Sequence, residues 1–357
     1  MYLRNRLTIP IKGYNRSIIY DLTRKDYHFI PNSVYKNLYS SNLIEIKEEE
    51  AKSFLEFEEI IFKASIEDLK LFPELTIKYK TPYHIVSLII HSDSLLGYNG
   101  QMQGINVESI SIIFNNLKEG FKVSKDVEKL LLDVDADSID IYLTDSDLSW
   151  SDQNLNFLKD KKEIFNLFVF ATSEEHQDVK DFLRKCLVEL NRIDTDYRSY
   201  TTDVYPSKFA VNKDLFIESK NRNAYYNKKI YIDQKGNISN GMFTEKVLIF
   251  SKLNSFDEIL NNILLTSRWT IVKDEIPICK NCEFRNMCID SRELKYSKLN
   301  DIWFYKNECR YNPFISKWEG EEGYLSLEDC NIQFHQGLLT YDKEDLSSIF
   351  NKVWLDE

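Results

Sequence analysis

CKNCEFRNMC, residues 279 to 288, is the stretch that most restricts what this chain is. Its thiols, Cys279, Cys282 and Cys288, follow the spacing C-x2-C-x5-C, and Cys309 comes later in the chain. Four thiolates close a tetrahedral site, for zinc or for an iron–sulfur cluster. The residues alone leave both centres open, and they leave Cys330 as an alternative fourth ligand.

Composition places the chain among ordinary globular proteins. It has 357 residues, 43% hydrophobic residues and a net charge of −11. An acidic protein is a poor general binder of nucleic acid or of an anionic membrane, so neither is expected as a partner. The apolar run at 85–90 is too short to span a bilayer, the first residues lack an apolar signal core, and clustered cysteines suit a reducing compartment. We therefore expect a cytoplasmic protein.

The pattern of apolar residues predicts an α/β protein. Alternating residues at 6–13, 16–22 and 25–31 predict three short strands, and helical spacing follows at 33–46 and 48–69. This order suggests a winged-helix-like module over residues 1–75.

Strand and helix signals then alternate through residues 76–235, which predicts a mostly parallel sheet. We expect strands at HIVSLIIH, SIDIYLTD and FNLFVFAT, helices at VESISIIFNNLKEGF and QDVKDFLRKCLVELNRI, and a hairpin turning at Gln234 to Gly236. Residues 236–330 form a cysteine-rich, loop-rich segment, and 331–357 form a tail that ends in a helix.

Longer stretches carry a resemblance to a known family. They are WTIVKDEIPICKNCEFRNMCIDSREL (269–294), ECRYNPFISKW (308–318), IPIKGYNRSIIYDLTRKDYHFIPN (9–32) and FAVNKDLFIESKNRNAYYNKKIYIDQKGNISN (209–240). Together they resemble the SPASM-domain peptide maturases of "grasp-with-spasm" systems. The resemblance implies a winged-helix peptide-recognition module, a radical-SAM-like partial (β/α) barrel and a SPASM domain. It also implies two partners, a ribosomally made precursor peptide and an ATP-grasp ligase, and it favours a [4Fe–4S] cluster over zinc.

Two departures from the family pattern restrict the expected chemistry. Radical SAM enzymes hold their catalytic cluster with C-x3-C-x2-C, but no cysteine precedes Cys186 here. The first auxiliary cluster of a SPASM domain also lacks ligands, because Gly241 stands at one cysteine position and Ser291 and Arg292 stand where another is expected. We therefore expect no S-adenosylmethionine, no radical SAM catalysis and a single four-cysteine metal centre.

The function expected from these observations is that of an accessory protein of peptide maturation. It would bind the leader of the precursor and work with the ligase, and no catalytic residue can be named. Two alternatives stay open: an enzyme that modifies the peptide by its own chemistry, and a metal-stapled protein-interaction module.

Basic residues near the N-terminus are the candidate peptide-binding site. Arg16, Arg24 and Lys25 flank the predicted strand RSIIYDL. An acidic leader would add as a strand to the edge of RSIIYDL, with these side chains attracting its carboxylates.

Overall fold

The computed structural model describes residues 1–39, 43–115, 124–144, 164–170, 189–193, 204, 206 and 209–355. These residues fall into two compact units, each made of several stretches of chain. Unit 1 comprises Met1–Tyr79, Val204–Ala224 and Ile271–Glu357, and unit 2 comprises Lys80–Asp203 and Tyr225–Thr270. The part of the cysteine-rich segment from residue 271 onward, which holds its five cysteines, belongs to the same unit as the N-terminal module, while residues 236–270 belong to unit 2. The division of the chain at residues 75, 235 and 330 stays a prediction.

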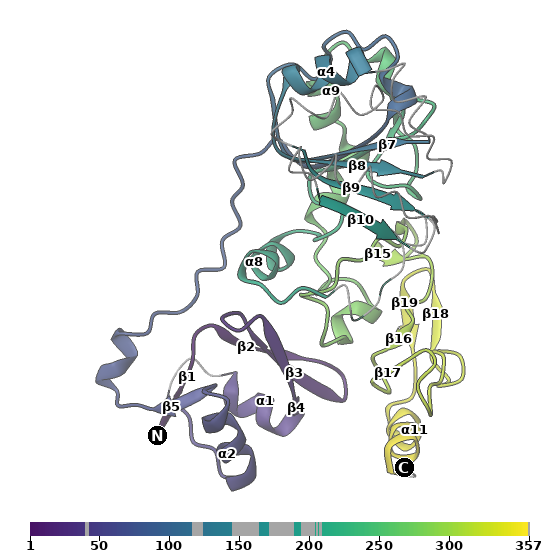
Figure 1. The fold of residues 1–357 in the computed structure, drawn as a ribbon. Helices are drawn as coiled ribbons and strands as arrows, with labels where there is room; N and C mark the ends of the chain where they lie inside the picture. The colour runs from purple at the N-terminus through teal and green to yellow at the C-terminus, as the bar shows by residue number, and fades with distance from the viewer. Residues whose placement is uncertain are drawn as a thin grey trace. The chain divides into compact units, whose positions relative to one another are not determined.

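An eight-stranded sheet forms the centre of unit 2 (Figure 1), with the strand order β10-β9-β8-β7-β6-β11-β12-β13. The first six strands of this order are parallel. β12 pairs antiparallel with β11, and β13 pairs antiparallel with β12. The strands are β6 (Ile85–His91), β7 (Ile105–Phe114), β8 (Val134–Leu143), β9 (Ile164–Phe170), β10 (Glu189–Ile193), β11 (Lys229–Ile232), β12 (Asn237–Ser239) and β13 (Leu248–Ile249). The predicted mixed α/β class with a mostly parallel sheet is confirmed.

One face of this sheet is an apolar core. Leu88, Ile110, Ile139 and Ile230 are fully or almost fully buried there, together with residues of the covering helices. The helices of this unit are α4 (Ser124–Asp133), α9 (Asp257–Leu260) and α10 (Ile263–Thr266). Figure 1 shows α4 and α9 on the same side of the sheet. Apart from a three-residue step near the start of β6 and β7, the core uses alternate residues of these strands and leaves the residues between them for the other face.

Two predicted helices of unit 2 are wrong in the parts that the structure describes. The stretch VESISIIFNNLKEGF begins inside β7, a ten-residue strand, and the stretch QDVKDFLRKCLVELNRI ends in β10. Asn115 follows β7, and the remaining residues of both stretches, including Cys186, lie outside the described residues. The predicted hairpin is confirmed, because β11 and β12 pair Ile232 with Ile238 around Gly236.

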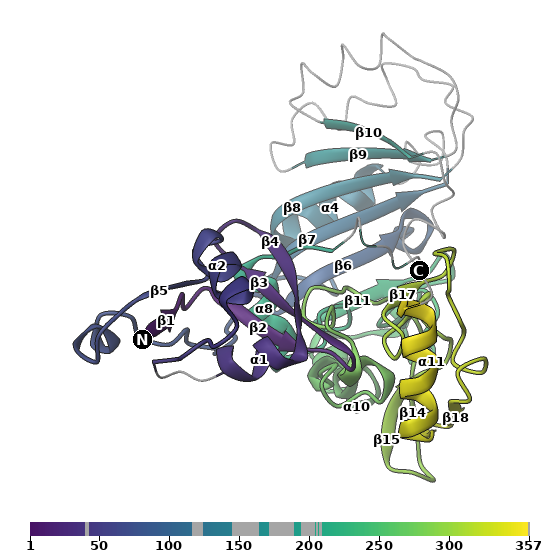
Figure 2. The same cartoon turned by 90° about the horizontal axis from the view of Figure 1, so that it is seen from below.

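The N-terminal part of unit 1 is a three-stranded antiparallel sheet with the order β2-β3-β4. Its strands, β2 (Thr8–Lys12), β3 (Arg16–Asp21) and β4 (Asp26–Pro31), confirm the three predicted strands. Successive residues of β3 alternate between two cores: Ile18 and Tyr20 pack in one, and Ile19 packs in the other. The second core holds α1 (Asn32–Leu38) and α2 (Glu49–Phe57), which lie close to this sheet in both views (Figure 2).

Further short elements complete unit 1. β1 (Tyr2–Arg4) pairs with β5 (Ile61–Lys63), a strand within a stretch that the sequence predicts as helical. The other elements are α8 (Lys213–Asn221), β14 (Leu294–Ser297), β15 (Ile302–Tyr305), β16 (Tyr311–Asn312), β17 (Lys317–Trp318), β18 (Gln333–His335), β19 (Leu338–Thr340) and α11 (Lys343–Leu355). The helix α11 confirms the predicted tail helix. No helix among the described residues is long and apolar enough to cross a membrane.

Candidate functional site: a four-cysteine pocket

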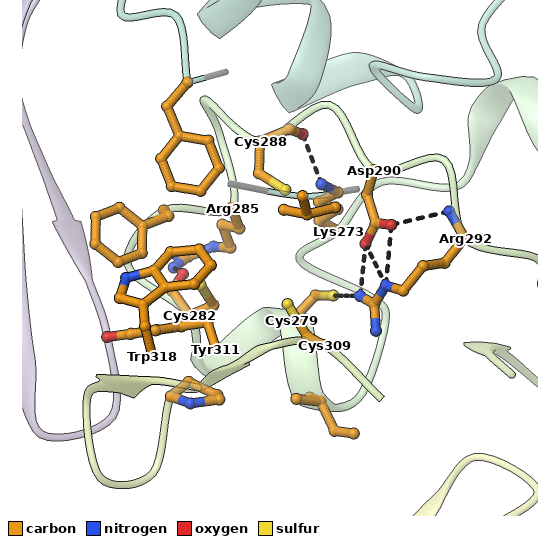
Figure 3. Close-up of a pocket in the computed structure, with 15 residues that line it drawn as sticks. Lys273, Cys279, Cys282, Arg285, Cys288, Asp290, Arg292, Cys309, Tyr311 and Trp318 are labelled. Carbon is orange, nitrogen blue, oxygen red and sulfur yellow. Dashed lines mark hydrogen bonds and ion pairs between the residues drawn. The ribbon is translucent and has the colours of Figure 1, made fainter. Parts of the chain in front are cut away.

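Four cysteines line one pocket of unit 1: Cys279, Cys282, Cys288 and Cys309. Its cavity volume is about 30 Å³, and its lining includes four aromatic residues, Phe209, Phe284, Tyr311 and Trp318. Figure 3 shows the cysteines gathered around this pocket. Cys330 lies elsewhere, in a separate apolar cluster, where its sulfur accepts a hydrogen bond from Asn312 at 3.5 Å. The structure thus groups Cys309, and not Cys330, with the C-x2-C-x5-C cysteines.

Local backbone structure brings the first thiols together. Cys279 lies in a short 3-10 helix, Ile278–Asn281, and the N–H of Cys282 donates to the carbonyl of Cys279 at 3.0 Å. A turn then follows, in which the N–H of Met287 donates to the carbonyl of Phe284. Met287 is fully buried and anchors the stretch between Cys282 and Cys288 in the core. Two consecutive turns therefore fold the thiols back toward one point.

Two cations, the buried Lys273 and the partly buried Arg292, stand beside the thiols, and the sequence did not indicate either as a site residue. Lys273 is 4% exposed, and its Nζ donates to the carbonyl of Cys288 at 2.6 Å. The guanidinium of Arg292 lies 4.0 Å from the sulfur of Cys279 and is held by Asp290 at 2.5 Å. Ser291 and Arg292 stand where the SPASM pattern expects a cysteine. That difference was the only feature of the sequence that could have pointed to Arg292 as a site residue. These cations would offset negative charge on the sulfurs.

Burial governs the ionisation of the thiols. It raises the pKa of Cys279 to about 12 and that of Cys288 to about 11, and it raises the pKa of Cys282 well above its ordinary value. Arg292 and Lys273 lower the pKa of Cys279, and Lys273 lowers that of Cys288, but burial is the larger effect. Burial therefore disfavours the thiolate form of all three thiols.

The N-terminal sheet holds the cysteine segment in place. Arg16 donates through Nε to Glu283 at 2.7 Å, and Tyr20 donates its hydroxyl to the Glu283 carbonyl at 2.9 Å. Arg285 also reaches the carbonyl of Lys12, at 2.6 Å. Because Glu283 follows Cys282 directly, the first two contacts fix the backbone next to a pocket thiol.

The predicted peptide-binding residues lie at opposite ends of β3. Arg16 is engaged with buried Glu283, and its guanidinium carbon lies 3.8 Å from the centre of the Phe29 ring. Arg24 pairs with Asp21 and Glu59, while Lys25 is exposed. The predicted route of strand addition to the edge of RSIIYDL is wrong, because β3 is the central strand and already pairs on both sides.

Comparisons with known proteins do not assign this chain to a family. The chain matches no protein-family model and no curated protein. Among solved structures it is similar to Streptococcus suis SuiB bound to S-adenosylmethionine, with 14% identity over 81% of this chain and 94% of SuiB. The TM-score is 0.30. A likeness at this level does not place the chain in a family.

The cofactor prediction needs correction. The statement that no S-adenosylmethionine is expected is contradicted, because the similar protein was solved with that molecule bound, and we withdraw it. Nor does the part of the chain that the structure describes contain three or more His, Cys, Asp or Glu side chains arranged so that they could hold a metal ion. The four thiols share a pocket without forming a closed ligand set, so we assign neither a [4Fe–4S] cluster nor zinc to them.

Proposed function

We propose that this chain binds the leader of a ribosomally made precursor peptide and presents that peptide to a partner ATP-grasp ligase. The observation that carries the proposal is the outer edge of β4. This strand pairs only with β3 among the described residues. An edge strand presents unpaired N–H and C=O groups, to which an extended peptide adds as a further strand.

The other edge of the sheet, β2, is less suited to accept a strand. Pro10 lies in the middle of β2 and has no N–H to donate. Two β2 carbonyls are already engaged by arginines, since Arg4 donates to Thr8 and Arg285 donates to Lys12. The leader is therefore proposed to add along β4 and not along β2.

Side chains at β4 suit an acidic, partly apolar leader. Phe29 is 44% exposed and packs at 5.9 Å from the ring of Phe284. Lys25 lies in the turn before β4, with a φ of 60°, and Arg24 precedes it. Lys25 is the residue proposed to attract leader carboxylates. Arg16 and Arg24 act through their ion pairs, which hold the sheet and its turn.

Hydrogen exchange with a synthetic leader of the cognate precursor tests this proposal. We expect the amides of residues 26–30 to gain protection when the leader binds, while those of β2 stay unchanged. Lys25→Glu should weaken binding several-fold, since it places a like charge beside the leader carboxylates. Lys63→Glu, which makes the same charge change on β5, is the matched control. Unchanged exchange along β4 in the presence of bound leader would overturn the proposal.

A further inference from the structure

The second face of the sheet in unit 2 differs from the apolar face. A parallel sheet is ordinarily buried on both faces and carries Val, Ile and Leu on each. Here the register instead lines up polar side chains: Ser111 of β7 lies beside Asp140 of β8, and Asp140 lies beside Asn166 of β9. Their neighbours Ile110, Ile139 and Leu167 point into the apolar core. A polar row of this kind contributes little to the core and is suited to a ligand.

Asp140 is the charged member of this row. It is half-buried, and its Oδ1 accepts a hydrogen bond from Asn166 Nδ2 at 2.8 Å. No lysine, arginine or histidine of the described residues forms an ion pair with it. Burial raises its pKa, and the hydrogen bond from Asn166 offsets only part of that effect. Among the described residues its partner is thus a neutral amide and not a cation, and a half-buried carboxylate with such a partner attracts a cation.

An aromatic pair stands one step further along the same face. Tyr142 and Phe168 are cross-strand neighbours whose ring centres lie 4.7 Å apart, with planes 11° from parallel. Residues two apart in a strand share a face, so the pair is about 7 Å from Asp140 and Asn166 along the strands. Aromatic faces carry partial negative charge and attract ammonium groups. A carboxylate, an amide and aromatic rings thus meet on one surface.

We propose that this face is a binding site for a primary ammonium group of the lysine type, held by Asp140 and flanked by Tyr142 and Phe168. The ligand is a lysine side chain of the bound peptide, and only this last step rests on the proposed function. The charge argument is independent of leader binding, because it depends on residues of unit 2 alone.

Two small probes test the site without any leader peptide. Nα-acetyl-lysine methylamide carries the ammonium group, and Nα-acetyl-norleucine methylamide is its uncharged analogue of similar shape. Binding to the full chain is followed by NMR chemical-shift titration. We expect the lysine probe to bind at least about tenfold more tightly, since a hydrogen bond to a charged group is stronger than a neutral contact. Equal binding of the two probes would overturn the proposal.

Variants then locate the effect. Asp140→Asn keeps the shape and the hydrogen bond from Asn166, and should weaken lysine-probe binding about tenfold or more. Asp140→Glu should retain most of the binding. The matched control is Asp135→Asn, an exposed aspartate of the same strand, which should change nothing. Tyr142→Leu should weaken lysine-probe binding a few-fold, because it removes one of the two aromatic rings. Unchanged binding in Asp140→Asn would place the ammonium group elsewhere.

The two proposals fail separately. If the leader does not protect β4 but the lysine probe still depends on Asp140, the ammonium site stands and the leader proposal falls. If the leader binds at β4 and Asp140→Asn leaves the lysine probe unaffected, the reverse holds.

Discussion

Arg16 donates to Glu283 at 2.7 Å, although 267 residues separate the two in the chain. Glu283 is fully buried, and the Arg16 side chain is 24% exposed. The same carboxylate accepts a hydrogen bond from the hydroxyl of Tyr311. Gly13 makes the approach possible, because a Cβ there would lie 2.9 Å from Glu283 Oε2. The pair joins the N-terminal sheet to the residue after a pocket cysteine.

Breaking this pair should destabilise the protein strongly. Arg16→Met removes the cation and leaves the Glu283 charge buried without its partner, and we expect a loss of about 3 kcal/mol in the free energy of unfolding. The measurement is urea unfolding at pH 7, monitored by a spectroscopic signal that comes from residues of unit 1. Arg24→Met, which removes a more exposed arginine of the same sheet, should cost less, because Asp21 keeps its hydrogen bonds from the backbone N–H groups of Thr23 and Arg24.

The double variant Arg16→Met with Glu283→Gln separates the ion pair from packing. It removes the buried charge together with its partner, so it should recover part of the stability lost in Arg16→Met. A double variant less stable than the sum of the two single variants would show that the interaction is not mainly electrostatic.

This pair also shows what sequence reasoning could and could not reach. Strands at 8–12, 16–21 and 26–31 follow from local alternation of apolar residues, and the short spacing of Cys279, Cys282 and Cys288 is enough to predict that they gather. The contacts of Arg16 are not local, and the sequence therefore indicated a free basic side chain. Its real partner, Glu283, carries no signal except proximity to Cys282.

The helix predicted where the structure has β7 is wrong for a different physical reason. Val107, Ile110, Ile112 and Phe114 all pack in the same core. The step from Val107 to Ile110 is three residues, which is helical spacing, while the later steps are two. The paired strands show the same change, because Ile85 is followed by Leu88 in the core of β6. A local irregularity across neighbouring strands thus imitates a helix, and no single strand reveals it.

Gly337 gives a prediction about the hairpin of β18 and β19. Gln336 and Gly337 have φ values of 46° and 87°, as in a type I′ turn. A Cβ at Gly337 would lie 2.4 Å from Cγ2 of Ile302, so Gly337→Ala combines backbone strain with a clash. We expect a loss of about 2–3 kcal/mol in thermal or urea unfolding.

The control for this glycine is Gly97→Ala. Gly97 also has a positive φ, of 75°, but a Cβ there would meet nothing within 4 Å. It should show only the backbone term, about 1 kcal/mol. Equal losses in the two variants would mean that the hairpin yields to the added methyl group.

His91 predicts a pH dependence near neutrality. Its Nε2 lies 3.0 Å from the hydroxyl of Tyr231, and burial lowers its pKa below the usual 6.5. The unfolded chain therefore binds a proton more readily, so this contribution to stability is present above about pH 6.5 and is lost as the pH falls toward the folded pKa. The urea concentration at the unfolding midpoint should be lower at pH 5.5 than at pH 7.5. His91→Gln should make the difference between these two midpoints smaller.

The matched histidine control is His335→Gln, since His335 is an exposed residue of β18. It should leave the pH difference as it is in the native chain. If His91→Gln leaves it equally unchanged, protonation of another group is responsible.

Asp233 predicts a second, more acidic transition. Burial raises its pKa, but hydrogen bonds from Lys246, from the Asn237 side chain and from backbone N–H groups outweigh burial and hold the pKa at about 2. A carboxyl with a lowered pKa stabilises the fold above its unfolded pKa, about 3.9, and this contribution is lost as the pH falls toward 2. The Cγ resonance of Asp233 should therefore still report a carboxylate at pH 3.

Lys246→Ala should raise the midpoint of that titration, because it removes one of the main stabilising contacts. Lys252→Ala, which removes an exposed lysine and leaves the pair of Lys246 with Asp233 intact, should leave the midpoint in place. A midpoint near 3.9 in the native chain would show that the turn at Gly236 does not hold the Asp233 carboxylate as the structure describes.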